Sequence, residues 1–154
     1  MLDHLFPKKD VKTYRGNPIA KWVFGLITMV TIGRSLVHMF LPDGGAKSIA
    51  TIPLDSFTVD GADAVILIFA FWGLSQLLIG FIYGLVLWRY QAFIPSMYLL
   101  LIIEYVMRIV LGVMKPIQTT GTAPGAIGNL IIVPIGIVML VLSLREGGKE
   151  QNNM

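Results

Sequence analysis

The chain has no cysteine and only two histidines, His4 and His38, among its 154 residues. The absence of cysteine excludes disulfides, thiolate metal sites, iron–sulfur clusters and covalently attached c-type haem. A haem held by two histidines at membrane depth is excluded within one chain, because His4 lies in the polar N-terminal tail. We therefore expect no metal site and no cofactor.

Charged residues are also scarce, at 14% of the chain against about a quarter in soluble domains. Hydrophobic residues make up 55%. They gather in four runs, each close to the roughly 20 residues that cross about 30 Å of hydrocarbon. The predicted spans are about 21–41, 64–88, 93–114 and 125–144.

These runs predict an all-α membrane protein, an antiparallel four-helix transmembrane bundle formed by residues 17–144. Polar tails at 1–16 and 145–154 flank it, and no room is left for a separate soluble domain. Asn17-Pro18 predicts a helix start, with asparagine as the cap and proline in the first turn. Pro134 predicts a kink in the last span.

The basic residues predict which side of the membrane holds the termini. With the N-terminus inside, only Lys47 and Lys115 lie outside, and Arg34 and Arg108 lie within the spans. The remaining eight lie inside: Lys8, Lys9, Lys12, Arg15, Lys21, Arg89, Arg145 and Lys149. The positive-inside rule then favours cytoplasmic termini in a multi-pass protein of the cell (inner) membrane. The same bias explains the net charge of +3, so no nucleic-acid partner is expected.

Polar residues within the spans are the candidate functional residues. Glu104 and Arg108 are four residues apart and share one helical face, and Arg34 and His38 have the same spacing. At 1.5 Å per residue, every span offers a polar group to the middle or outer part of the bundle. The candidate ligand-binding residues are Arg34, His38, Gln76, Glu104, Arg108 and Asn129.

Two arginines and one glutamate leave one positive charge in excess among these residues. A charge facing lipid costs about 2.5–3.5 kcal/mol on insertion scales, so these groups should face inward. An arginine in excess favours a phosphate or carboxylate, because its planar fork bonds two oxygens at once. We therefore expect Arg34 and Arg108 to hold an anionic or polar lipid-like ligand. Glu104 would orient Arg108, while His38 and Gln76 would add hydrogen bonds.

Three other interpretations remain open at this stage. The charged residues can form a purely structural network that fixes helix register. The chain can be an accessory subunit of a larger complex, or an oligomer, with Gly73, Gly80 and Gly84 as the contact face. It can also be a quinone-linked oxidoreductase or a proton-coupled transporter. The sequence contains no nucleophile elbow, HExxH motif or phosphate-cradling glycine loop, so we favour a non-catalytic role.

Several short stretches resemble the DoxX-like group of small bacterial membrane proteins. They are Gly33-Arg34, residues 71–80 (FWGLSQLLIG), and Glu104 with Arg108-Ile-Val-Leu-Gly112. The similarity covers about residues 20–144. It implies a four-helix bundle and, in some members, a link to quinone or sulfur redox chemistry. This chain has no cysteine for thiol chemistry, so only the architecture is carried over.

Overall fold

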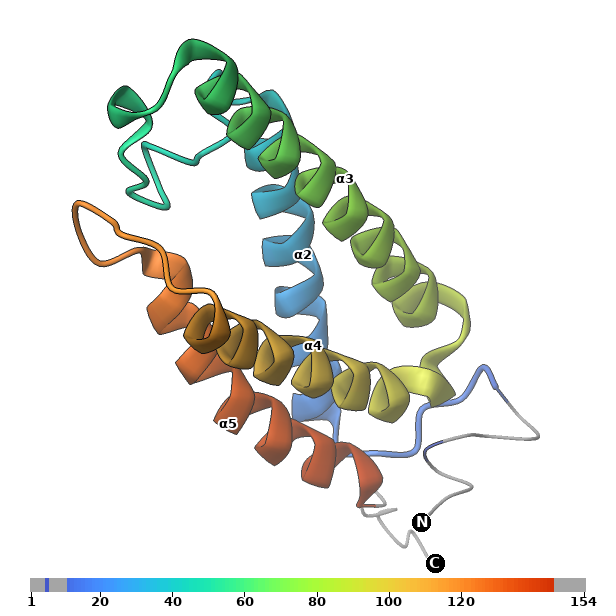
Figure 1. Cartoon of the computed structure of the whole chain (residues 1–154). Helices are drawn as coiled ribbons and strands as arrows, with labels where there is room; N and C mark the ends of the chain where they lie inside the picture. The colour runs from blue at the N-terminus through green and yellow to red at the C-terminus, as the bar shows by residue number, and fades with distance from the viewer. Residues whose placement is uncertain (1–4, 6–10, 146–154) are drawn as a thin grey trace, which may run out of the picture.

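The computed structural model describes residue 5 and residues 11–145 (Figure 1). Its long helices are α2 (Pro18–Phe40), α3 (Val59–Arg89), α4 (Ile94–Met114) and α5 (Pro124–Leu144). Short 3-10 helices, η1 (Leu54–Ser56) and η2 (Gln91–Phe93), precede α3 and α4. Strands are absent from the described ranges. All four long helices are long and apolar enough to cross a membrane, which confirms the all-α prediction and the expectation of four helices of spanning length. Lys8, Lys9 and the tail at 146–154 lie outside the described residues.

The start of α2 follows the predicted signal. The Asn17 side chain accepts a hydrogen bond from the Ile19 backbone N–H at 2.9 Å, and Pro18 is the first helical residue. The backbone N–H of Asn17 in turn donates to Leu142 O at 3.2 Å. The beginning of α2 is therefore fastened to the end of α5.

The second span begins earlier than residue 64, the predicted position. Thr58 caps α3 by accepting from Gly61 N at 3.2 Å, and the helix starts at Val59. Asp60 in the first turn suits the positive end of the helix dipole. The capping residue and this acidic turn extend the helix beyond its apolar stretch, so the connection is shorter than the predicted 43–63. Pro134 lies inside α5 without ending it.

The helices pack chiefly as two pairs, α2 along α3 and α4 along α5 (Figure 1). Glycines permit the close approach of the first pair. A Cβ at Gly73 would lie 2.9 Å from His38 Cβ, and one at Gly80 would lie 2.7 Å from Ile32 Cγ1. Of the three glycines expected at a partner interface, these two face α2 of the same chain, whereas Gly84 faces open space.

Phe24 on α2, Tyr83 on α3 and Tyr98 on α4 form an aromatic core. Phe24 is fully buried, with its ring centroid 5.0 Å from Tyr83 and 5.4 Å from Tyr98. The Tyr98 hydroxyl donates to Ala20 O at 2.6 Å, which joins α4 to α2. Trp22 and Trp88 are 79% and 78% exposed, as residues facing lipid or its interface would be.

Candidate functional site

Polar side chains from three helices meet in a line across the bundle. Arg34 on α2 donates through Nη2 to Gln76 Oε1 on α3, at 2.6 Å. Gln76 donates through Nε2 to Glu104 Oε1 on α4, at 3.3 Å. Arg108, one turn further along α4, pairs with the same carboxylate. We call Arg34, Gln76, Glu104 and Arg108 the charged network.

Glu104 neutralises Arg108 and no other arginine. The Arg108 Nε donates to Glu104 Oε1 at 3.1 Å, and Nη2 donates to the same oxygen. Every hydrogen bond that the described residues give this carboxylate goes to Oε1, which leaves Oε2 available. The two side chains are 26% and 18% exposed, whereas Gln76 is buried.

Arg34 has a neutral partner instead of a carboxylate. Within the described part of the chain, no carboxylate oxygen lies within the 4.0 Å of an ion pair. The Nε of Arg34 is buried and has no hydrogen-bond partner among the described residues. Because an arginine stays protonated in proteins, the network carries one uncompensated positive charge. The expected excess cation is therefore Arg34, with Gln76 holding its guanidinium.

Trp72 lies between the two arginines and was not among the predicted residues. The Cζ of Arg108 is 4.9 Å from the Trp72 ring centroid, and that of Arg34 is 5.5 Å away. Both distances allow a cation–π attraction. The signal was present in the sequence, because Trp72 precedes Gln76 by four residues and shares its helical face. Tyr105 gives Arg108 a second ring at 5.2 Å.

His38 closes the end of α2 and makes no hydrogen bond to the charged network among the described residues. Its Nδ1–H donates to Gly44 O at 2.8 Å. That bond leaves Nε2 as the acceptor nitrogen of the neutral ring. The centroid of the His38 ring is 4.6 Å from that of Trp72 and 5.7 Å from that of Phe69, which it meets edge-on. His38 thus supports Trp72, which in turn contacts both arginines.

Asn129 is the one predicted residue that the structure does not bring to this group. It is partly buried on α5, and its side chain makes no hydrogen bond within the described ranges. The other five residues lie together or contact Trp72. Because α5 is apolar on all sides, its sequence pattern does not indicate which face of the helix points into the bundle, and so the direction of the Asn129 side chain could not be predicted.

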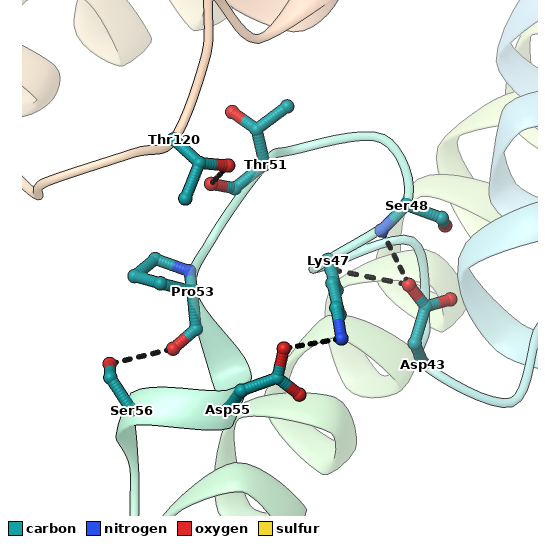
Figure 2. Close-up of polar contacts among 8 residues, drawn as sticks. All are labelled: Asp43, Lys47, Ser48, Thr51, Pro53, Asp55, Ser56 and Thr120. Atoms are coloured by element: carbon teal, nitrogen blue, oxygen red, sulfur yellow. Dashed lines mark hydrogen bonds and ion pairs between the residues drawn. The ribbon is translucent and has the colours of Figure 1, made fainter.

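Asp43 organises the connection that follows α2. It accepts from the backbone N–H groups of Gly45 at 2.9 Å, Lys47 at 3.2 Å and Ser48 at 2.6 Å (Figure 2 shows the last two). Partial burial works to raise the pKa of this carboxyl, but the donated hydrogen bonds outweigh it and hold the pKa below its ordinary value. Lys47 also pairs with Asp55 at 2.5 Å. Asp43 and Asp55 therefore make these contacts within the connection itself.

This connection also contacts the one between α4 and α5 (Figure 2). Thr51 O accepts from Thr120 N at 2.9 Å and from Thr120 Oγ1 at 3.2 Å. The Thr51 hydroxyl donates to Gly121 O at 2.9 Å. Thr51 has φ of 56°, which is uncommon for a β-branched residue. The two helix pairs are thus joined at the end nearest the charged network.

No protein-family model, no curated protein and no solved structure matches the chain. The DoxX-like resemblance therefore stays a prediction, and any function has to follow from the chemistry of these residues.

Proposed function

We propose that this chain is a small integral membrane protein that binds an anionic, lipid-like ligand through Arg34 and Arg108. The site lies in the outer half of an antiparallel four-helix bundle whose termini face the cytoplasm. The observation that carries the proposal is the pairing of Arg34 with a neutral amide, at 2.6 Å, while Arg108 takes the carboxylate.

The charge balance supports an anion over a neutral ligand. A charge at membrane depth is expensive unless it is paired or solvated. The Gln76 amide orients the Arg34 guanidinium but leaves its charge uncompensated. A monoanion would bring the charged network to neutrality, and it would find the fork geometry that phosphates and carboxylates favour.

The depth of the site supports a ligand from the membrane. Glu104 is at the midpoint of α4, which runs from Ile94 to Met114. Arg34 and Arg108 each stand six residues from the outer ends of their helices, or about 9 Å along the axis. An anion reaching this depth with an attached apolar chain would keep that chain in hydrocarbon.

The positive-inside rule supports the orientation. Basic residues flank the end of the bundle that holds the start of α2 and the end of α3, where Lys21 and Arg89 lie. The connections at the opposite end contain Lys47 and Lys115 but also the aspartates 43 and 55. A cytoplasmic location for the basic end follows from this bias.

Native mass spectrometry of the detergent-purified protein tests the proposal. Phosphatidylglycerol should remain bound at collision energies that strip phosphatidylcholine. Gln76→Glu gives Arg34 a carboxylate and should remove this preference. Gln91→Glu is the matched control, because Gln91 also accepts from a cation, Lys21 Nζ at 2.9 Å, at the other end of the bundle.

Equal retention of the two lipids would contradict the proposal. The proposal would also be contradicted if the Gln76→Glu variant kept the preference for phosphatidylglycerol, as the Gln91→Glu control should.

A further inference from the structure

Tyr83 is a buried polar side chain that the charged network does not use. The residue is 1% exposed, and its hydroxyl has no hydrogen-bond partner among the described residues. A buried polar group without a partner destabilises the folded protein, so such groups are uncommon. The neighbouring phenol of Tyr98 is bonded to Ala20 O, so the apolar surroundings alone do not explain the unpaired hydroxyl.

Tyr83 lies near the charged network. Gln76 and Tyr83 are seven residues apart, so they share one face of α3. Long side chains on a helix lean toward its N-terminus, which for α3 is the Gln76 side. Tyr83 also lies within electrostatic range of Glu104, Tyr105 and Arg108 on α4. Tyr83 of α3 and Glu104 of α4 therefore lie near each other, on the side of α3 from which Gln76 donates to Glu104.

Two neighbouring residues on different helices therefore each have an unused hydrogen-bonding group. Glu104 Oε2 is an acceptor that receives no hydrogen bond from the described residues. The Tyr83 hydroxyl is a donor for which residue 5 and residues 11–145 provide no acceptor. A hydroxyl group is the simplest partner for both, because it can donate to the carboxylate and accept from the phenol together.

We propose that Tyr83 and Glu104 Oε2 form a hydroxyl-binding subsite beside the two arginines. The ligand is then an anionic phosphate ester or a free carboxylate that carries a neighbouring hydroxyl, such as a polyol phosphate headgroup. The arginines hold the anion, and the subsite selects the hydroxyl. This inference rests on the proposed function and deepens it, because charge alone would not distinguish anions with and without a hydroxyl.

Two monoanionic lipids that differ in the headgroup hydroxyls provide the test. Phosphatidylglycerol has these hydroxyls, and phosphatidylethanol has the same phosphodiester charge without them. Wild-type protein in phosphatidylcholine nanodiscs should bind phosphatidylglycerol on the order of tenfold more tightly, as expected for one or two additional neutral hydrogen bonds. Glycerol 3-phosphate against propyl phosphate repeats the comparison for a water-soluble source of the same chemistry.

Tyr83→Phe should abolish the preference within either pair and leave the affinity for phosphatidylethanol unchanged. Tyr98→Phe is the matched control, because it removes a buried phenol hydroxyl that already has a partner. It should preserve the preference. Since Tyr83→Phe removes no hydrogen bond seen in the described residues, the variant should fold as the wild type does, which its melting temperature checks.

Equal affinity of wild-type protein for the two members of each pair would overturn the subsite and leave the anion site standing. A preference that survives Tyr83→Phe would also overturn it. Failure of both anionic lipids and both soluble phosphates to bind would instead overturn the proposed function. A preference confined to the soluble pair would support the subsite and identify a soluble ligand.

Discussion

Arg34 donates to the amide oxygen of Gln76 at 2.6 Å, and among the described residues no carboxylate lies near enough to pair with it. Arg108 has the opposite environment, because it holds Glu104 with two of its nitrogens. Two arginines in one network therefore have different electrostatic roles. Arg108 belongs to a neutral ion pair, while the positive charge of Arg34 has no counterion among the described residues.

This difference predicts unequal effects of removing each arginine. Arg108→Gln leaves Glu104 without its cation and should lower the free energy of unfolding by about 3 kcal/mol, the lower end of the cost for a buried ion pair, because this pair is partly buried. Arg34→Gln leaves no carboxylate unpaired and should change it by about 1 kcal/mol or less. Thermal unfolding of the two variants in the same detergent measures the contrast. Equal losses of stability in the two variants would contradict the contrast, because they would show that Arg34 is paired with a carboxylate as Arg108 is.

Alanine substitutions should separate the glycines of α3. A Cβ at Gly73 would lie 3.0 Å from the backbone oxygen of Ser35, which cannot move as a side chain can. Gly73→Ala should therefore destabilise the protein by about 1–3 kcal/mol through separation of α2 and α3. Gly84→Ala is the control and should be neutral or slightly stabilising, because its site is open and alanine favours helix. A melting temperature unchanged by Gly73→Ala would contradict the close contact between these helices.

The connection after α2 should lose order in acid because of Asp43. Its pKa is below the ordinary value, so the charged form stabilises the fold above a pH of about 4. That contribution is lost as the pH falls through the lowered pKa. Between about pH 5 and about pH 3, the melting temperature of Asp43→Asn should therefore fall less than that of the wild-type protein. Asp63→Asn, at an exposed position on α3, is the control and should follow the wild-type profile.

The contact between the connection after α2 and the connection between α4 and α5 can be trapped covalently. A Cβ at Gly121 would lie 3.8 Å from Thr51 Cγ2, so a Thr51→Cys/Gly121→Cys pair needs little adjustment to form a disulfide. The chain has no other thiol, which makes loss of thiol labelling a direct readout. The disulfide should form under mild oxidation, whereas Thr51→Cys/Ala123→Cys should remain largely reduced. Similar oxidation of both pairs would indicate that the connections move freely past each other.

Features that depend on local sequence could be predicted well. Hydrophobic length was sufficient for the four spans, and Asn17-Pro18 was sufficient for the start of α2. The Glu104–Arg108 pair followed from its spacing within one helix. Each of these depends only on residues that are close together in the chain.

Features that depend on helix rotation could not be predicted in the same way. The partner of Arg34 is set by how α2 and α3 turn about their axes, so Gln76 could not be distinguished from Glu104 beforehand. The same rotation brings Trp72 to both arginines, and it leaves the Asn129 side chain without a hydrogen bond to the described residues. The start of α3 at Val59 was missed because a threonine cap, and not hydrophobicity, determines it.

The most direct measurement uses Trp72 as a reporter of anion binding. Trp22 and Trp88 are exposed, so replacing both with phenylalanine leaves Trp72 as the only tryptophan at little cost to the fold. In phosphatidylcholine nanodiscs, titration with phosphatidylglycerol should change Trp72 fluorescence saturably, and Arg34→Gln should abolish this change without unfolding the protein. A response to phosphatidylglycerol that equals the response to added phosphatidylcholine, or that persists in Arg34→Gln, would contradict Arg34 as the cation that binds the anion.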